Sequence, residues 1–257
     1  LTTFADDGAT CAGGVEPLAY DRVAATGLLE QVHLPLPETE SGNLGPAAVS
    51  ATRAALEAAT AAVVGPGLGS EESVRLFLES LLLSDPDSRG ADPAPETPLV
   101  LDADALNALA VTYEWWKRVR APAVLTPHPG EMANLTDRTV ADIETDRIAV
   151  AKGFAEKYQV NLVLKGHRTI IATPERLWVN PHGNDALAKG GSGDVLTGMI
   201  TAFLAQGAEA AEAMQIAVYL HATAGERAAG THSHYGVTPG DVIEASKGIL
   251  KEMEEKK

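Results

Sequence analysis

Cysteine is almost absent from this sequence of 257 residues, in which Cys11 is the only one. A single cysteine cannot form a disulfide within the chain. The seven histidines form no HExxH motif, and no CxxC pair occurs, so the usual zinc-binding spacings are missing. We therefore expect a cytoplasmic protein in a reducing environment, without a zinc site.

Positive charge and long apolar runs are also scarce. Lysine and arginine number 20 against 35 aspartates and glutamates, which gives a formal net charge of −15. Nucleic acids and anionic membranes would repel such a surface, so neither is expected as a partner. No stretch approaches the roughly 20 apolar residues of a membrane-spanning helix, and the first residues lack the basic segment of a signal peptide. A small molecule is the favoured ligand.

The length and the 45% hydrophobic content suffice for one large core, and no segment has the composition of a linker between domains. We expect residues 1–257 to form a single α/β domain. Short continuous apolar runs alternate with helix-spaced segments, which is typical of a parallel sheet covered on both faces. The expected strands are residues 62–64, 99–101 and 123–125, and the expected helices are residues 50–62, about 71–83 and about 140–158.

The pattern changes after residue 161. Three apolar runs, at residues 162–164, 169–171 and 177–179, are too close together for helices to separate them, which predicts an antiparallel edge. The proline-bearing segment 84–98 is predicted to be an exposed loop. Helices at about residues 193–205, 208–229 and 239–255 are expected to complete the chain.

Glycine-rich segments follow several of these strands, but neither GxxxxGK[ST] nor GxGxxG occurs. The strongest segment is Lys189-Gly190-Gly191-Ser192-Gly193-Asp194, which leads directly into an apolar-periodic helix. Unpaired amides at a helix N-terminus bind phosphate oxygens, and Asp194 in the first turn could accept a proton from a substrate hydroxyl. The alternative is that Asp194 is only a helix residue favoured by the dipole, after a simple glycine turn.

Five blocks at strand ends occur in a fixed order. They are Val64-Gly65-Pro66-Gly67-Leu68-Gly69, Leu101-Asp102-Ala103-Asp104-Ala105-Leu106-Asn107, Leu125-Thr126-Pro127-His128-Pro129-Gly130-Glu131-Met132, Val163-Leu164-Lys165-Gly166 and residues 190–198. With these blocks the chain resembles the ADP/ATP-dependent NAD(P)H-hydrate dehydratases of the ribokinase-like superfamily, over about residues 60–245. The last block alone indicates only the superfamily, whereas the second and third blocks together indicate the dehydratase.

This resemblance implies a fold and an activity. The fold is a ribokinase-like three-layer sandwich, with a mostly parallel central sheet, helices on both faces and an antiparallel edge. The activity is that of a lyase in metabolite repair: ADP or ATP phosphorylates the ring hydroxyl of hydrated NADH or NADPH, and phosphate is then eliminated. Phosphate is a far better leaving group than hydroxide, and Mg²⁺ is expected from phosphoryl-transfer chemistry. Asp194 would be the catalytic base.

The resemblance also implies roles for individual residues. Gly67, Gly69, His128 and Asp194 match positions that contact the hydrated dinucleotide. The nucleotide-contacting stretches match Lys165, Gly166, His167, Arg168, Thr169, Asn184, Asp185, Ala186, Leu187, Ala188, Lys189, Gly190, Gly191, Ser192 and Gly193. Because ligands bind beyond the carboxyl ends of parallel strands, we expect one cleft to collect these segments.

Several polar residues keep two interpretations. Asp102, Asp104, Asn107 and Glu131 stand at strand ends, where they could hold Mg²⁺ directly or through water. Capping a helix or bonding to a loop is equally economical, so the metal ligands stay unknown. We expect His221 to be a packed helix residue rather than a catalytic one.

The resemblance is incomplete at the N-terminus. Family members begin with a strand and a helix that form part of the substrate wall, and residues 1–5 match the strand that follows them, so we expect a truncated chain. In some members an epimerase domain lies upstream, and that arrangement is left open here. We expect a homo-oligomer. The rival interpretations are a related kinase acting on a vitamin precursor or sugar alcohol and, less favoured, a nucleotide sensor without activity.

Overall fold

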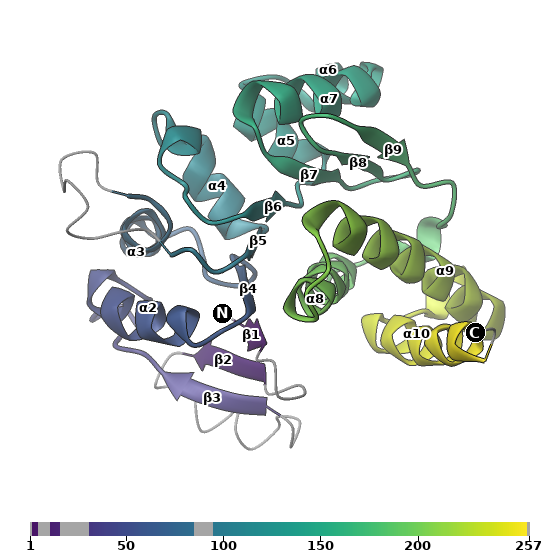
Figure 1. Cartoon of the computed structure of the whole chain (residues 1–257), viewed down its shortest axis with the longest axis horizontal. Helices are drawn as coiled ribbons and strands as arrows, with labels where there is room; N and C mark the ends of the chain where they lie inside the picture. The colour runs from purple at the N-terminus through teal and green to yellow at the C-terminus, as the bar shows by residue number, and fades with distance from the viewer. Residues whose placement is uncertain (1, 5–10, 16–30, 85–94, 256–257) are drawn as a thin grey trace.

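One mixed sheet organises the chain, seen here in a computed structural model that describes residues 2–4, 11–15, 31–84 and 95–255 (Figure 1). Its strand order is β3-β2-β1-β4-β5-β6-β7-β8-β9. The strands are β1 (Thr2–Phe4), β2 (Cys11–Val15), β3 (Gln31–Pro35), β4 (Ala61–Val64), β5 (Leu99–Leu101), β6 (Ala123–Leu125), β7 (Asn161–Leu164), β8 (Ile170–Ala172) and β9 (Leu177–Val179). Strands β4 to β7 are parallel, and β7, β8 and β9 pair antiparallel. The predicted antiparallel edge is therefore confirmed.

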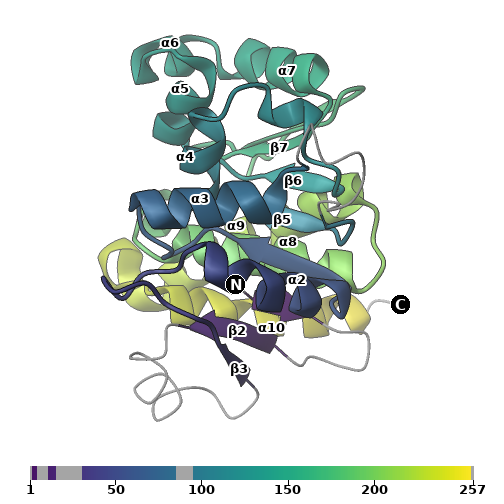
Figure 2. The same cartoon turned by 90° about the vertical axis from the view of Figure 1, so that its left-hand side faces the viewer.

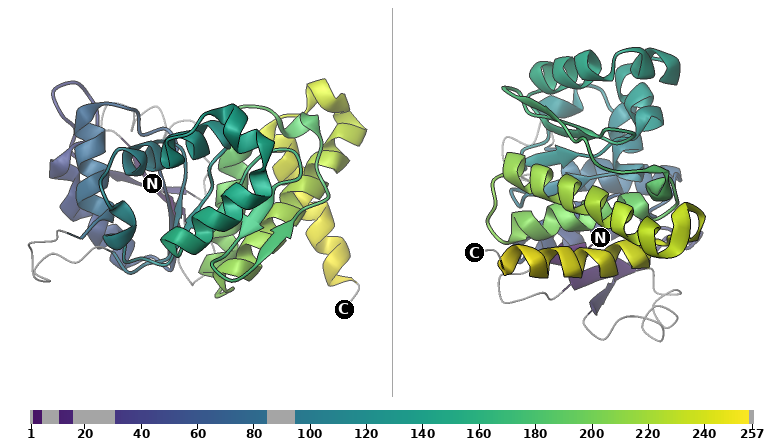
Figure 3. Two further views of the ribbon diagram at one scale, coloured as in Figure 1. Left: turned by 90° about the horizontal axis from the view of Figure 1, so that it is seen from above. Right: turned by 90° about the vertical axis from the view of Figure 1, so that its right-hand side faces the viewer.

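Helices cover both faces of this sheet. They are α2 (Val49–Glu57), α3 (Glu72–Leu82), α4 (Asp104–Ala110), α5 (Pro129–Thr136), α6 (Val140–Thr145), α7 (Arg147–Tyr158), α8 (Ser192–Ala205), α9 (Ala210–Gly236) and α10 (Pro239–Glu254), with 3-10 turns η1 (Pro46–Ala48), η2 (Trp115–Lys117) and η3 (Asp185–Leu187). In Figure 2, α2 and α3 lie in front of the sheet while α8, α9 and α10 lie behind it. The right-hand view of Figure 3 shows α9 and α10 side by side on that far face.

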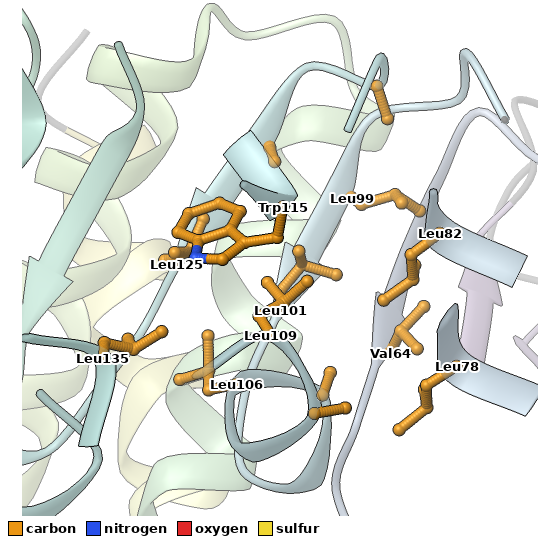
Figure 4. Close-up of a cluster of buried hydrophobic side chains, with 14 of the residues drawn as sticks. Val64, Leu78, Leu82, Leu99, Leu101, Leu106, Leu109, Trp115, Leu125 and Leu135 are labelled. Atoms are coloured by element: carbon orange, nitrogen blue, oxygen red, sulfur yellow. The ribbon is translucent and has the colours of Figure 1, made fainter. Parts of the chain in front are cut away.

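Each central strand buries side chains on both of its faces. In β5, Leu99 and Leu101 point into the cluster formed with α3, α4 and η2, which Figure 4 shows around Trp115. Val100, between them, belongs to a second cluster with residues of α8 and α9. Because successive side chains of a strand point to opposite faces, a continuous apolar run is the expected pattern for such a strand. The mostly parallel sheet with helices on both faces is thus confirmed.

The prediction of one helix over residues 140–158 is wrong. The segment divides into α6 and α7 at Asp146, whose φ of −150° and ψ of 75° are not helical. The Asp146 carboxylate accepts a hydrogen bond from the backbone N–H of Ala149 at 3.0 Å and so caps α7. The capping preference of aspartate is the signal in the sequence that could have marked this break.

The N-terminal strands extend the sheet beyond β4. β1, expected as a strand, is antiparallel to both of its neighbours, and β2 and β3, which the apolar pattern does not predict, pair parallel. Much of the predicted loop over residues 84–98 lies outside the described residues, since the description omits residues 85–94. Among the helices that are described, none combines the length and apolar character needed to cross a membrane.

Candidate active site at the carboxyl edge of the sheet

Polar segments from four strands meet at one edge of the sheet. β4 to β7 are parallel, so their carboxyl ends lie together. Lys165 Nζ, after β7, lies 2.7 Å from Asp102 Oδ1, after β5, and 3.7 Å from Glu131 Oε2 in α5. Asp104 Oδ2 accepts a hydrogen bond of 2.8 Å from the backbone N–H of Gly69, which follows β4. The segments after all four strands are therefore tied to one another by side-chain contacts.

The Lys165–Asp102 ion pair is largely removed from water. The Asp102 side chain is 2% exposed and the Lys165 side chain is 18% exposed. Glu131, which is also buried, gives this cluster two carboxylates for one ammonium group. A buried charge is tolerated only when it is paired, so each partner depends on the other. The pair fixes the end of β5 against the end of β7.

The N-terminus of α8 begins beside this cluster. Gly191, the N-cap residue, has a φ of 85°, and no side chain caps the helix. Within the described residues, the backbone N–H groups of Gly193 and Asp194 have no hydrogen-bond acceptor. A β-carbon on Gly193 would lie 3.4 Å from Lys165 Nζ. Because residue 193 is a glycine, the N–H groups at the start of α8 and the ammonium group of Lys165 can face the same small space. Such a space is suited to an anion.

Asp194 is the third residue of α8. Its side chain is exposed and, in the part of the chain that the structure describes, makes no hydrogen bond or ion pair. A carboxylate that served only to cap the helix would accept a backbone N–H, and this one does not. Asp194 therefore offers free acceptor oxygens beside the unpaired amides.

A cavity of about 360 Å³ lies between the loop after β7, the segment before α8, and α9. This volume is within the usual range for small-molecule sites. Eleven of the fifteen residues predicted to contact the nucleotide line it: Lys165, Gly166, His167, Arg168, Thr169, Asn184, Asp185, Leu187, Ala188, Ser192 and Gly193. The other four, Ala186, Lys189, Gly190 and Gly191, do not line it, and Ala186 is packed in the core.

The sequence-based prediction missed six residues of the cavity wall: His182, Gly183, Leu196, Val218, His221 and Ala222. Val218, His221 and Ala222 belong to α9, a long alanine-rich helix without a phosphate or metal motif. In the sequence these residues are marked only by lying on the apolar face of a helix. Ordinary core residues have the same pattern. Apolar and polar side chains together form the wall, which is usual for small-molecule sites.

His221 is packed in α9, as expected. It is 8% exposed, and its Nε2 lies 3.2 Å from the Ser192 hydroxyl at the start of α8. Burial lowers the pKa of His221 to about 4, so the ring is neutral near pH 7. The neutral ring joins α9 to the first residue of α8 and also lines the cavity.

His128 caps α5 rather than standing free. Its Nδ1 accepts hydrogen bonds from the backbone N–H groups of Gly130 at 3.0 Å and Glu131 at 3.2 Å. Glu131 Oε2 in turn accepts the His128 backbone N–H at 2.7 Å, which completes a capping box. Because Nδ1 is an acceptor, the neutral ring carries its proton on Nε2. The exposed ring also borders a second, open cavity of about 570 Å³ that includes Asn107.

The predicted residues are therefore distributed over more than one cavity. Gly69, Asp104 and Asn107 border a smaller cavity of about 220 Å³, and Asn107 is shared with the cavity beside His128. Gly67 has a φ of 72° with open space where a side chain would project. The prediction that one cleft collects all of these residues is therefore not met. They border several cavities along one edge of the sheet instead.

Hydrogen bonds account for two of the residues left open as metal ligands. Asp104 accepts the Gly69 N–H, and Asn107 Oδ1 accepts a weak bond of 3.4 Å from Asn134 Nδ2. Across the described residues, no group of three or more His, Cys, Asp and Glu side chains is arranged to hold a metal ion. Asp104 therefore bonds to the loop after β4 rather than capping a helix, and Asn107 bonds to a residue of α5 rather than to a loop.

Comparison with known proteins decides the family. The family model described as NAD(P)H-hydrate dehydratase matches residues 19–247. The chain belongs to the NAD(P)H-hydrate dehydratase family. A bifunctional NAD(P)H-hydrate repair enzyme of Moorella thermoacetica is 36% identical over 240 residues, which are 93% of this chain and 43% of that protein. The chain thus spans less than half the length of this bifunctional relative.

Solved structures of similar proteins share the fold. The ADP/ATP-dependent NAD(P)H-hydrate dehydratase from Bacillus subtilis, co-crystallized with ATP/Mg²⁺ and soaked with CoA, matches with a TM-score of 0.73 and 31% identity. The match covers 94% of this chain and 80% of that one. A ribokinase-like superfamily protein from Enterococcus faecalis matches with a TM-score of 0.73 and 25% identity over 94% of this chain and 76% of that one. The predicted ribokinase-like fold of this dehydratase-family chain is confirmed.

Proposed function

We propose that the chain catalyses the nucleotide-dependent dehydration of (S)-NADH-hydrate and (S)-NADPH-hydrate, which returns them to NADH and NADPH. The observation that supports this best is at the start of α8. The exposed carboxylate of Asp194 and the backbone N–H groups of Gly193 and Asp194 have no partner among the described residues, and they lie next to the cavity of about 360 Å³. A base and an anion site are thus combined where a phosphoryl group would pass between two bound molecules.

The reaction would proceed in two steps. Asp194 accepts the proton of the ring hydroxyl, whose oxygen forms a bond to the terminal phosphorus of ADP or ATP while the bridging P–O bond breaks and releases AMP or ADP. The carbon–oxygen bond of the phosphate ester then breaks with its electron pair going to phosphate. The neighbouring ring carbon loses a proton, which restores the double bond of the reduced nicotinamide.

The nucleotide would occupy the cavity of about 360 Å³. Its base fits between apolar side chains such as Leu187 and Val218, and its phosphates would extend toward the amides at the start of α8. The relative from Bacillus subtilis is described as ADP/ATP-dependent, in agreement with this assignment. Lys165, although paired with Asp102, lies close enough to Gly193 to approach the phosphates.

The substrate would lie on the other side of Asp194, toward His128, Gly67 and Gly69. His128 Nε2 lies 3.3 Å from Glu131 Oε1 and could bond to a ligand instead. Gly67 and Gly69 have positive φ values and open space around them, so a ligand can approach their backbone closely. These roles follow from the family resemblance and are compatible with the geometry.

Mg²⁺ fits this site as a partner of the nucleotide rather than as a resident metal. It usually takes one or two protein carboxylates and completes its shell with phosphate oxygens and water. The buried carboxylates of Asp102 and Glu131, on either side of Lys165, fit that small protein share. The ion would neutralise charge on the nucleotide phosphates.

The decisive assay supplies hydrated NADH or NADPH with ADP or ATP and Mg²⁺. We expect inorganic phosphate to be released and the absorbance of the reduced nicotinamide to return. A related kinase would instead accumulate a stable phosphorylated product with a vitamin precursor or sugar alcohol. If the intact chain consumes nucleotide only in that second reaction, the proposal is wrong.

Replacing the proposed base tests Asp194 directly. Asp194→Asn should lower kcat by about a hundredfold or more while nucleotide binding is retained, because only proton transfer is removed. Glu212→Gln is the matched control: it removes an exposed carboxylate from the first turn of α9, away from the site, and should leave kcat unchanged. A nucleotide sensor without activity would give no turnover in any of these proteins.

A further inference from the structure

A single guanidinium group holds the loop that follows β7. Arg147, the first residue of α7, donates from Nη1 to the carbonyl of His167 at 2.5 Å. Its Nη2 donates to the carbonyls of Leu164 at 3.2 Å and Lys165 at 3.0 Å. Three carbonyls, one at the end of β7 and two in the loop after it, therefore accept hydrogen bonds from one side chain of α7.

This loop would not keep its shape without support. Gly166 has a φ of 137°, and Arg168, which is not a glycine, has a φ of 55°. Conformations of this kind persist only when surrounding contacts impose them. The loop carries Lys165, His167 and Arg168 into the wall of the cavity, so its shape decides where these side chains lie.

Gly166 and Arg147 fit each other closely. A β-carbon on Gly166 would lie 2.8 Å from Arg147 Nη2 and 3.1 Å from its Cζ. Any side chain at 166 would therefore displace the guanidinium from the carbonyls. The glycine and the arginine act as one unit, although they are separated by the whole of α7 and β7.

The charge of Arg147 is not neutralised nearby. Within the described residues it makes no ion pair, and its charged group is bonded to carbonyl oxygens alone. A guanidinium so placed contributes positive potential behind the wall of the cavity, in a protein whose net charge is −15. That potential favours an anionic ligand.

We propose that Arg147 is a positioning residue for the nucleotide. It fixes the loop of residues 165–169 in the shape that receives the phosphates, and it adds positive potential from behind. This inference rests on the proposed function, because it takes the cavity beside the loop to be the nucleotide site. The proposed role concerns nucleotide binding alone, so binding of the hydrated dinucleotide should not be affected.

Calorimetric titration of the intact chain with ADP and with ATP, in the presence of Mg²⁺, tests this role. Arg147→Gln should weaken binding by about tenfold or more, since three charge-assisted hydrogen bonds are lost. Arg147→Lys should recover only part of the affinity, because an ammonium group keeps the charge but not the planar fork. Arg176→Gln, an exposed arginine in the turn between β8 and β9, removes the same charge and should bind nucleotide as the unaltered chain does.

Gly166→Ala provides a second test that leaves Arg147 in place. It should also weaken nucleotide binding, because the added carbon displaces the guanidinium and an alanine is strained at the φ of 137° that residue 166 adopts. In both variants the KM for nucleotide should rise while the KM for the hydrate stays unchanged. A general loss of fold would instead alter both constants and lower the melting temperature in parallel.

The outcomes separate the two proposals. Failure of the unaltered chain to bind ADP or ATP would overturn the proposed function and this inference with it. Binding by the unaltered chain, with equal affinity in Arg147→Gln and Gly166→Ala, would overturn the positioning role alone. Full recovery in Arg147→Lys would show that charge rather than loop geometry is responsible, and would equally overturn it.

Discussion

Replacing Lys165 with methionine should measure how much of the fold depends on the buried ion pair. Methionine retains most of the length and apolar character of lysine but removes the ammonium group. Asp102, with 2% of its side chain exposed, would then keep a negative charge without its partner, next to the buried Glu131. Removing one partner of a buried pair typically costs about 3–5 kcal/mol. For a chain of this size that corresponds to a fall in melting temperature of roughly 10 °C.

A surface pair with the same geometry is the control. Lys247 Nζ also lies 2.7 Å from a carboxylate oxygen, that of Glu244, but the two side chains are 65% and 74% exposed. Lys247→Met should cost no more than about 0.5 kcal/mol, because water screens an exposed pair. The difference between the two variants is therefore the effect of burial, with the contact distance held constant.

The measurement is urea unfolding of Lys165→Met and Lys247→Met. It is repeated for Asp102→Asn and for the double variant Lys165→Met/Asp102→Asn. The double variant should be more stable than Lys165→Met alone, because the unpaired charge is removed with its partner. The reasoning fails if Lys165→Met is destabilised no more than Lys247→Met, or if the double-mutant cycle shows no coupling between Lys165 and Asp102.

Two further predictions concern buried positions near the same edge. Burial lowers the pKa of His221 from 6.5 to about 4, so as pH falls below 6.5 the unfolded chain takes up a proton that the folded chain refuses. The free energy of unfolding should therefore fall by about 2 kcal/mol between pH 7.5 and pH 5. In His221→Gln this fall should be absent. The prediction is contradicted if urea unfolding of the variant and of the unaltered chain depends on pH in the same way. Gly65→Ala should unfold the chain or destabilise it by about 3 kcal/mol or more, because its β-carbon would lie 1.8 Å from the Asp102 carbonyl oxygen at a φ of 130°. Gly42→Ala, with a φ of 79° and open space, should cost only about 1 kcal/mol in the same melting experiment.

The central strands could be predicted from the sequence because a short, continuous apolar run indicates a strand that is buried on both faces. β5 and β6 coincide with the predicted residues 99–101 and 123–125, and each is buried on both faces. The outer strands β2 and β3 lack this signal. β2, which reads Cys-Ala-Gly-Gly-Val, has two glycines at its centre and pairs through its backbone with β1 and β3. Pairing between distant segments is not legible from a local pattern.

The candidate site divides in the same way. Glycines and charged residues at strand ends are visible in the sequence, and their convergence follows from the parallel arrangement of the strands. The partners that hold them are not visible. Arg147 is one of four arginines in the described α-helices, and its three carbonyl acceptors become apparent only when α7 is placed beside β7. His221 is similarly indistinguishable in sequence from any packed helix residue.

The strongly acidic composition and the proposed binding of two anionic nucleotides are compatible because the positive groups are local. Lys165 is held by the buried Asp102, and Arg147 is held by carbonyl oxygens, so both cations remain fixed without an exposed counter-ion. The unpaired amides at the start of α8 add partial positive charge that no titration removes. Electrostatic interactions at contact distance in a partly dry site outweigh the screened repulsion of distant surface carboxylates. The net charge would repel polyanionic surfaces without weakening the binding of a small phosphorylated ligand that reaches this edge of the sheet.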